Sequence, residues 1–403
     1  MLPLYIALPV LNESENLPDF LACMKKQELH DFELVVCVNN YEWWWDDEEK
    51  RSLCQDNQKS INLLKHEKEI SIQIIDCSSR GKGWLKKKGG VGMARKTALD
   101  FIARKVNDEA VLVSMDADTD YPRDYLLKIV TYFQEHPNYS GLSLPYYHPL
   151  TGIAEQDRLL LRYELYMRYY ALNMIRIHNP YRYTALGSAM AFPAWAYRKA
   201  GGLTPVKSGE DFYFLQKLVK MGEIGYTADT QVYPSARLSD RVLFGTGPAL
   251  IKGQKGDWSS YPFYPSSFFD DVEQTFALFP VLYQNDVPTP MDDFLKYQFR
   301  DNDLWGPLRR NYKDRKNFVK ACMNKVDGLR ILQYLRWRFG NQLPDNKGVL
   351  VNYILRHASG ITIPSALRDF GQYGFEAATI DQLNALRDFI FRWEMQSRSE
   401  KVQ

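Results

Sequence analysis

The chain has 403 residues and a formal net charge of +2, and 45% of its residues are hydrophobic. This length is sufficient for two ordinary globular domains, and the near-neutral charge excludes a general electrostatic attraction to nucleic acid. Five widely spaced cysteines contain no CxxC pair, which excludes the usual zinc motifs. Early polar residues and the lack of a long apolar run predict a soluble cytoplasmic protein without signal peptide or membrane span.

The first part of the chain alternates strand-like and helix-like segments. Four apolar runs predict strands at residues 2–10, 32–40, 71–78 and 109–116. The segments between them, including residues 90–106, predict helices. The alternation predicts an α/β fold with a mainly parallel sheet flanked by helices. Ligands of such sheets bind beyond the carboxyl ends of the strands, where Asn39, Asp76 and Asp116 stand.

After the fourth run, the sequence VSMDADTDYP places Asp116, Asp118 and Asp120 at every second position. Alternate side chains leave a strand on the same side, so Asp116 and Asp118 could share a hard divalent cation. A solvated turn or a helix N-cap explains the same residues and is the better account of Asp120. The motif is short, and by itself it leaves both interpretations open.

Residues 80–96, RGKGWLKKKGGVGMARK, contain seven basic residues, five glycines and no acid. Glycine lets backbone amides approach an anion and basic side chains neutralise phosphate, so the segment is a candidate diphosphate site. It does not match the Walker motif, and no GxGxxG follows the first strand, which disfavours a dinucleotide fold. A solvated loop explains Lys86, Lys87 and Lys88 equally well. Arg95 differs because it lies on the predicted helix.

Further along, Glu210 and Asp211 open a predicted helix in the sequence GEDFYFLQKLVKMG. Acids are favourable at a helix N-terminus because of the helix dipole, so the pair alone does not indicate a function. As chemistry, a carboxylate in this position could act as a general base.

The order of these segments is more specific than any one of them. ALPVLNE, VVCVNN, the basic glycine segment with GMAR, SMDAD, GSAMAF followed by GGL, and GEDFYFLQKLVKMG come in series. In this order the sequence resembles the family 2 glycosyltransferases of the GT-A fold. The resemblance covers residues 1–245 and implies a nucleotide-diphospho-sugar transferase-like domain there.

The resemblance also implies roles for individual residues. The implied donor-binding residues are Pro9, Asn12, Glu13, Asn39, Arg95 and Asp116. The implied metal ligands are Asp118 and Asp116, and the implied acceptor-side residues are Gly187 and Ser188. Asp211 matches the catalytic base, with Glu210 helping to position the acceptor.

Some positions depart from the family pattern. Leu11 stands where an aromatic ring often stacks on the base, and Asn39 stands where an acid is usual. These departures leave uridine, guanosine and thymidine open as the base. No histidine lies between His178 and His357, so phosphate or water would replace a histidine as third metal ligand.

The implied reaction is a metal-dependent, inverting transfer of a hexosyl group. Mn²⁺ or Mg²⁺ on Asp118 would neutralise the diphosphate of a nucleotide-diphosphate sugar, with a UDP-sugar favoured. Asp211 would take the proton from a hydroxyl of a glycan or lipid-linked acceptor, as in the assembly of a cell-envelope polysaccharide. Arg237 and Arg241 could close over the diphosphate, although a surface hairpin explains both equally well.

Two other functions stay open at this point. A sugar-phosphate nucleotidyltransferase shares the α/β plan but carries its glycine-rich phosphate loop after the first strand, where this chain has PVLNE. A non-catalytic nucleotide-sugar-binding module would not need both the 116/118 pair and the 210/211 pair.

The rest of the chain is less informative. Residues 246–290 predict a linker or loop region, because the density of Pro and aromatic residues rises over 258–290. Residues 291–403 predict a helical C-terminal region. An Arg- and Tyr-rich helix at 155–178 could contact a membrane as a peripheral site, or it could be an ordinary half-buried helix. A homodimer also stays open. QYLRW, from Gln333 to Trp337, matches a motif of membrane-bound synthases and is interpreted as coincidence.

Overall fold

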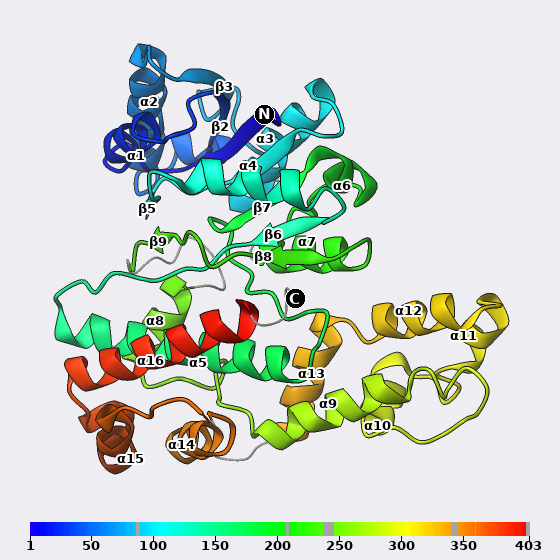
Figure 1. Ribbon diagram of the computed structural model, residues 1–403. Helices are drawn as coiled ribbons and strands as arrows, with labels where there is room; N and C mark the ends of the chain where they lie inside the picture. The colour runs from blue at the N-terminus through cyan, green and yellow to red at the C-terminus, as the bar shows by residue number, and fades with distance from the viewer. Residues whose placement is uncertain (86–88, 207–208, 237–245, 341–344, 359, 400–403) are drawn as a thin grey trace. The chain divides into compact units, whose positions relative to one another are not determined.

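The computed structural model describes residues 1–85, 89–206, 209–236, 246–340, 345–358 and 360–399. These residues form two compact units (Figure 1). Unit 1 comprises Met1–Leu160 and Tyr183–Asp257, and unit 2 comprises Leu161–Arg182 and Trp258–Gln403. The chain therefore enters unit 2 twice, and residues 246–290, expected as a linker, contribute helices to both units.

Unit 1 is built on a seven-stranded sheet. In spatial order its strands are β3 (Ser71–Cys77), β2 (Phe32–Asn39), β1 (Leu4–Val10), β4 (Val111–Ser114), β7 (Met190–Pro193), β6 (Gly141–Ser143) and β8 (Ile224–Tyr226). Neighbouring strands are parallel except for β7, which runs antiparallel to both β4 and β6. The carboxyl ends of β1, β2, β3 and β4 consequently meet at one edge of the sheet.

The strands form where the sequence has continuous apolar runs. β1 and β2 pair in register from Leu4 with Phe32 to Val10 with Val38, and both are buried over nearly their whole length. Such burial on both faces is typical of a parallel sheet covered by helices. The helices of unit 1 are α1 (Leu17–Lys25), the 3₁₀ turn η1 (Glu42–Trp45), α2 (Arg51–His66), α3 (Val91–Lys105), α4 (Tyr125–Glu135), α6 (Ala194–Lys199), α7 (Glu210–Val219) and α8 (Thr246–Gln254).

Helix α3 carries a central part of the site because it packs directly on β1 and β2. Its buried side includes Ala94, Ala98 and Leu99, and small residues at this spacing let the helix approach the strands closely. The helix begins after Gly90, which has a φ of 90° and is therefore in a conformation that favours glycine.

A short two-stranded ribbon follows the aspartate motif. β5 (Thr119–Asp120) pairs antiparallel with β9 (Tyr233–Pro234), and the Ser235 amide donates to the Asp118 carbonyl at 3.0 Å. This pairing brings residues 233–235 beside the motif although more than 110 positions separate the two segments in the sequence.

The predicted α/β fold class, with a mainly parallel sheet flanked by helices and a mostly helical C-terminal region, is confirmed. The four predicted strands are present, and the fourth is shorter than expected because it ends at Ser114. Asp116 therefore lies beyond the strand, on the turn that follows it.

In the described part of unit 2, helices joined by loops are the only regular secondary structure. Besides the part of α5 (Ala154–Arg176) that begins at Leu161, its helices are α9 (Ser266–Leu278), α10 (Asp292–Phe299), α11 (Gly306–Asn311), α12 (Arg315–Lys325), α13 (Gly328–Phe339), α14 (Asn346–His357), α15 (Ser365–Ala377) and α16 (Ile380–Ser399). Across the described ranges, no helix is both long and apolar enough to span a membrane.

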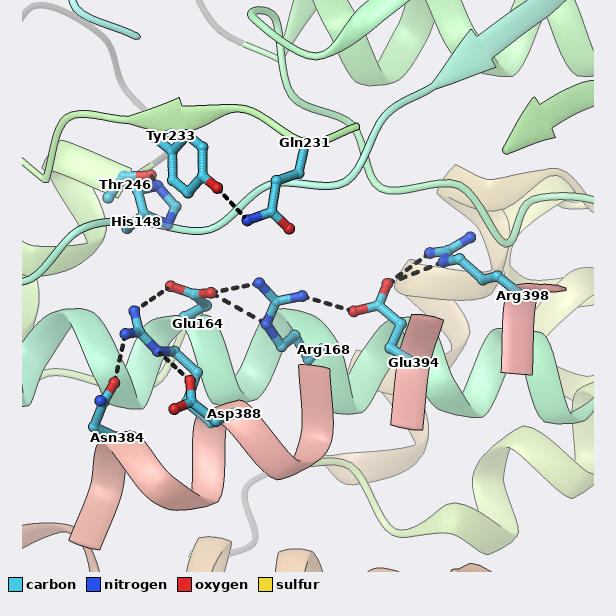
Figure 2. A network of polar contacts seen from close by, with 11 residues as sticks. His148, Glu164, Arg168, Gln231, Tyr233, Thr246, Asn384, Asp388, Glu394 and Arg398 are labelled. Atoms are coloured by element: carbon cyan, nitrogen blue, oxygen red, sulfur yellow. Dashed lines mark hydrogen bonds and ion pairs between the residues drawn. The ribbon is translucent and has the colours of Figure 1, made fainter. Parts of the chain in front are cut away.

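A buried series of charged residues joins α5 to α16 (Figure 2). Arg168 donates to Glu164 at 2.5 Å and to Glu394 at 2.9 Å, and Glu394 also accepts from Arg398 at 2.9 Å. Arg387 donates to the second oxygen of Glu164 at 3.2 Å. Each charge meets an opposite one, which offsets the large desolvation cost of placing them in the interior.

The Arg- and Tyr-rich helix expected at 155–178 is α5, and its basic and aromatic residues are mostly interior. Arg162, Arg168, Tyr166 and Tyr169 are all buried. Packing rather than membrane contact therefore explains its composition. QYLRW lies on α13, where Arg336 is exposed. Trp337 contacts the ring of Tyr334 and is 44% exposed.

Candidate functional site

Arg95 connects four segments at the carboxyl edge of the unit 1 sheet. Its guanidinium donates from Nη2 to Asp116 Oδ1 at 2.9 Å and from Nε to Glu210 Oε1 at 3.2 Å. Its Nη1 donates to Ser114 Oγ at 2.5 Å and to the Gly187 carbonyl at 3.2 Å. The end of β4, the start of α7 and the segment before β7 are thereby held together by one side chain of α3.

The Arg95 side chain is almost completely buried, at 2% exposure for the residue. Burial alone would lower its pKa, but the nearby carboxylates of Asp116 and Glu210 raise the pKa above the ordinary arginine value. Arg95 is therefore a permanent buried cation whose charge is matched by acids. A planar guanidinium suits this position because it directs several N–H donors outward in fixed directions.

Asp116 lies at the outer end of this group, with 31% of its side chain exposed. The turn that carries it is fixed by Tyr121, whose hydroxyl accepts from the Asp116 amide at 2.9 Å. Asp118 is also half-buried, and its carbonyl is paired with Ser235. Asp120, in contrast, is exposed, and one of its carboxylate oxygens accepts from the Tyr121 amide, which agrees with its interpretation as a turn residue.

Glu210 and Asp211 begin α7 as expected, yet their side chains have different surroundings. The Glu210 side chain is buried at 6% exposure and bonded to Arg95, whereas Asp211 is half-buried and accepts from the Phe212 amide at 2.7 Å. Burial and the adjacent Asp211 raise the pKa of Glu210 to about 7. Burial, and secondarily the charge of Asp116, also raise the pKa of Asp211.

Gly187 and Ser188, expected on the acceptor side, lie against the same group. The Gly187 carbonyl accepts from Ser114 Oγ at 2.6 Å, and a Cβ at Gly187 would stand only 2.6 Å from Arg95 Nη2. Glycine is therefore required here by the close approach of the guanidinium. Ser188 is buried, and its carbonyl accepts from Tyr125 at 3.5 Å.

The expected donor-binding residues of the first two strands lie at the ends of β1 and β2. Asn39 is buried and donates to the Val10 carbonyl at 2.9 Å, and its Oδ1 accepts from Trp84 at 3.3 Å. Asn12 has a φ of 56°, a left-handed conformation that asparagine tolerates, and its amide donates to Asn57 Oδ1 at 3.0 Å. These contacts fix the loop after β1 relative to β2.

Pro9 and Glu13 complete the expected donor residues on this side. Pro9 lies within β1, paired with Cys37 of β2, and Glu13 is buried and accepts from Asn16 at 2.5 Å. Asp76, at the end of β3, accepts from the Ser79 amide and from Lys82 at 3.0 Å each. Although burial opposes it, these donors hold the pKa of Asp76 well below its ordinary value.

The basic glycine segment is held by an acid that the sequence analysis did not single out. The two oxygens of Glu42 accept from the amides of Gly81 at 2.7 Å and Gly83 at 2.8 Å. The Glu42 amide in turn donates to the Trp84 carbonyl at 2.9 Å. The amides of Gly81 and Gly83 are thus engaged within the protein.

Several expected residues lie outside the described part of the chain. These are the basic-loop residues Lys86, Lys87 and Lys88 and the diphosphate candidates Arg237 and Arg241. Their expected roles stay predictions.

The residues that could hold a divalent cation are Asp116 and Asp118. Both are partly exposed carboxylates on one fixed turn, and hard cations prefer oxygen ligands. Within the described residues, no group of three or more His, Cys, Asp or Glu side chains is placed to hold a metal. Two protein carboxylates still suit Mg²⁺-type ions, which commonly take their remaining ligands from substrate phosphates and water.

Three residues of this edge were missed by sequence reasoning: Ser114, Glu42 and Asn57. Ser114 is the last residue of β4 and looks like an ordinary strand residue, and its role depends on Arg95 from another element. Glu42 precedes three tryptophans, and Asn57 lies in a polar helix. The only signal available was that a polar residue at a strand end faces the ligand edge of such a sheet.

No family model and no curated protein matches the chain. Among the solved structures similar to it is S. aureus TarS 1–349 in complex with UDP-GlcNAc, at 13% identity over 99% of this chain and 92% of that chain, with a TM-score of 0.42. The mannosyltransferase PcManGT from Pyrobaculum calidifontis, in complex with GDP-Man and Mn²⁺, is 12% identical over 100% and 88%, with a TM-score of 0.39.

A third similar structure is GalNAc-T7 with UDP, GalNAc and Mn²⁺, at 14% identity over 79% of this chain and 56% of that chain, with a TM-score of 0.37. Two of these three structures contain a nucleotide sugar, and two contain Mn²⁺. The fold of this chain is assigned from its own strand order.

Proposed function

We propose that the protein is a glycosyltransferase that moves a sugar from a nucleotide-diphosphate sugar to an acceptor hydroxyl with inversion. The observation that carries the proposal is the connection through Arg95 between Asp116, after β4, and Glu210, beside Asp211 at the start of α7. It joins two acidic motifs, 94 positions apart in the sequence, at the edge where α/β sheets bind ligands.

The general base is Asp211. Of the two acids that begin α7, it is the more exposed, while Glu210 is buried and bonded to Arg95. Burial raises the pKa of Asp211, which makes its carboxylate a stronger base than that of an ordinary aspartate. Asp211 takes the proton from the acceptor hydroxyl as the oxygen attacks the anomeric carbon on the face opposite the diphosphate.

Glu210 and Arg95 act as positioning residues in this proposal. Arg95 holds Asp116 and Glu210, and Glu210 in turn keeps the start of α7, with Asp211, against the end of β4. Preorganised groups of this kind contribute to catalysis because they need no rearrangement during the reaction. Gly187, whose carbonyl accepts from Arg95, and the neighbouring Ser188 form the acceptor side of the site in this proposal.

A divalent cation, Mn²⁺ or Mg²⁺, is held by Asp118 and Asp116 in this proposal. When bound, it supplies neutralisation of the negative charge that develops on the departing nucleoside diphosphate. The nucleotide lies over the ends of β1 and β2, near Pro9, Asn12, Glu13 and Asn39, with a UDP-sugar favoured. The acceptor is a hydroxyl of a glycan or a lipid-linked glycan, and residues 1–245 carry the transferase chemistry.

The test is incubation with a panel of UDP-, GDP- and dTDP-sugars and Mn²⁺, with released nucleoside diphosphate measured. Release that depends on the divalent cation and stops on chelation supports the proposal. Release of inorganic pyrophosphate from a nucleoside triphosphate and a sugar phosphate would instead indicate a nucleotidyltransferase. Binding of a nucleotide sugar without any turnover would contradict a catalytic role.

Asp118 and Asp120 provide a matched pair of variants within that assay. Asp118→Asn removes a carboxylate from the proposed metal site and should lower turnover at least about 100-fold at a fixed Mn²⁺ concentration, since charge stabilisation of the leaving group is lost. Asp120→Asn makes the same chemical change on an exposed turn residue and should leave turnover within about twofold. Equal losses in both variants would contradict the distinction drawn between the two aspartates.

A further inference from the structure

Basic residues are concentrated in one short segment of unit 2. Residues 310–320, RNYKDRKNFVK, contain five basic residues and one acid, a net charge of +4 in a chain whose total is +2. The basic residues are Arg310, Lys313, Arg315, Lys316 and Lys320. We call the surface formed by these five side chains and Tyr312 the polybasic surface.

The segment runs from the end of α11 through a short turn into α12, and its charged side chains point to solvent. α12 buries Phe318, Ala321 and Cys322 on one side. The five basic side chains are all exposed, and those of Arg315, Lys316 and Lys320 lie on α12 itself. Figure 1 shows α11 and α12 at one end of this unit, away from α14, α15 and α16.

Most of this positive charge is not balanced within the protein. The single acid, Asp314, caps α12, and its side chain accepts from the amide and the side-chain nitrogen of Asn317 at 2.8 and 2.6 Å. Within the described ranges, Lys313, Arg315, Lys316 and Lys320 form no ion pair. The neighbouring Arg309, in contrast, lies 2.7 Å from Asp286.

Contacts with the rest of unit 2 fix the backbone of the segment. The Lys313 carbonyl accepts from the Tyr283 hydroxyl at 2.6 Å, and Phe318 anchors α12 in the interior. Tyr312 stands among the cations with 39% of its surface exposed. An exposed tyrosine beside several lysines and arginines is the composition that suits the headgroup region of a bilayer.

We propose that the polybasic surface binds membranes that contain anionic phospholipids. Four cations without an internal partner match a surface of lipid phosphates, and Tyr312 can enter the interface between them. A single-stranded polyanion is the less fitting partner, because such sites combine a groove with several stacking rings. This surface runs over the end of α11, a turn and the outer side of α12, and it has a single exposed ring. The proposal is independent of the enzymatic activity, since it concerns binding alone.

The experiment is sedimentation of the full chain with vesicles of phosphatidylcholine, alone or mixed with phosphatidylglycerol. We expect binding to the mixed vesicles at low salt, weakening as NaCl is added, and no binding to phosphatidylcholine alone. The variant Lys313→Gln, Arg315→Gln, Lys316→Gln, Lys320→Gln should bind the mixed vesicles at least about 100-fold more weakly. The milder pair Lys316→Gln, Lys320→Gln should lose about tenfold and serves if the quadruple variant does not fold.

A control with the same charge change comes from unit 1. The variant Lys26→Gln, Lys59→Gln, Lys65→Gln, Lys68→Gln removes four exposed positive charges and should keep vesicle binding within about threefold. The proposal is overturned if the chain does not bind anionic vesicles, or if both quadruple variants weaken binding equally. Binding of soluble polyphosphate or single-stranded RNA in the absence of vesicle binding would overturn it in favour of a polyanion partner.

Discussion

Both units contain a buried arginine between two carboxylates, but the two groups differ in how far solvent reaches their carboxylates. In unit 2, Arg168 lies between Glu164 and Glu394, and all three side chains are at most 2% exposed. In unit 1, Arg95 is similarly buried, but one of its partners, Asp116, is partly exposed, and Asp211 beside Glu210 is half-buried.

This difference distinguishes a structural group from a candidate catalytic one. A closed set of buried charges can fix how α5 and α16 pack, but its atoms do not reach a substrate. The group around Arg95 ends in carboxylates that solvent reaches, and the pKa of both Glu210 and Asp211 is raised. Perturbed acids at the ligand edge of a sheet are typical of functional sites. Variants of the two groups should therefore differ in their effects on activity and on stability.

The largest effect is expected for Asp211→Asn, since it removes the proposed base. Turnover should fall by about 10³-fold, within the range for a lost general base, while nucleotide-sugar affinity stays within about threefold. The measurement is kcat from nucleoside diphosphate release together with the dissociation constant from calorimetry. Asp229→Asn, an exposed aspartate of the same unit, is the matched control. Full turnover in Asp211→Asn would exclude Asp211 as the base.

Arg168→Met should affect stability instead of turnover. It leaves Glu164 and Glu394 buried with one cation fewer, and breaking a buried pair in this way costs about 3–5 kcal/mol. Denaturant unfolding should show the loss, whereas kcat per folded molecule should be unchanged. Arg392→Met, on the exposed side of α16, should change the free energy of unfolding by less than about 0.5 kcal/mol.

Arg95→Lys should affect both properties. A lysine keeps the charge, but one ammonium group cannot reach Asp116, Glu210, Ser114 and Gly187 at once. We expect a loss of about 2–3 kcal/mol in stability and about 100-fold in turnover. Arg104→Lys, exposed on the same helix, is the control. If the Arg95→Lys protein is destabilised but its turnover is unchanged, the charged group around Arg95 has only a structural role, like the group around Arg168.

The smallest effect concerns the pH dependence of stability. Folding raises the pKa of Glu210 from 4.5 to about 7, so the folded protein binds this proton more tightly than the unfolded chain does. The resulting stabilisation is complete below about pH 4.5 and is lost as the pH rises through about 7. Glu210→Gln should remove this loss of stability, on the order of 3 kcal/mol, and should make the melting temperature less dependent on pH between pH 5 and 8. A wild-type slope in the variant would contradict the raised pKa.

The sequence allowed the fold and the positions of the acids to be predicted, because both follow from local patterns. Apolar runs indicated the strands, and Asp116 and Glu210 stand at element ends that can be recognised from their neighbours. What connects them could not be predicted. Ser114 and Gly187 contact Arg95 across 19 and 92 positions of sequence, and Arg95 itself was expected to bind the donor rather than to be enclosed by protein groups.

The buried charged group of unit 2 could not be predicted from the sequence either. Glu164 and Arg168 are four residues apart on a helix, the usual spacing of a solvated surface pair, and Glu394 lies 226 positions beyond Arg168. Only tertiary packing places such a pair in the interior. The same limit applied to α5 as a whole, whose Arg and Tyr residues could have indicated either a membrane contact or a core.

We propose that the edge around Arg95 is the donor site and that Asp211 faces it. A crystal structure with a nucleoside diphosphate and Mn²⁺ tests this claim most directly, because the anomalous signal locates the metal independently of the nucleotide. We expect Mn²⁺ to be bound by Asp118 and Asp116, the diphosphate to lie on the metal and the nucleobase to lie over the ends of β1 and β2. Metal and nucleotide bound elsewhere, with the carboxylates of Asp116 and Asp118 taking no part, would contradict it.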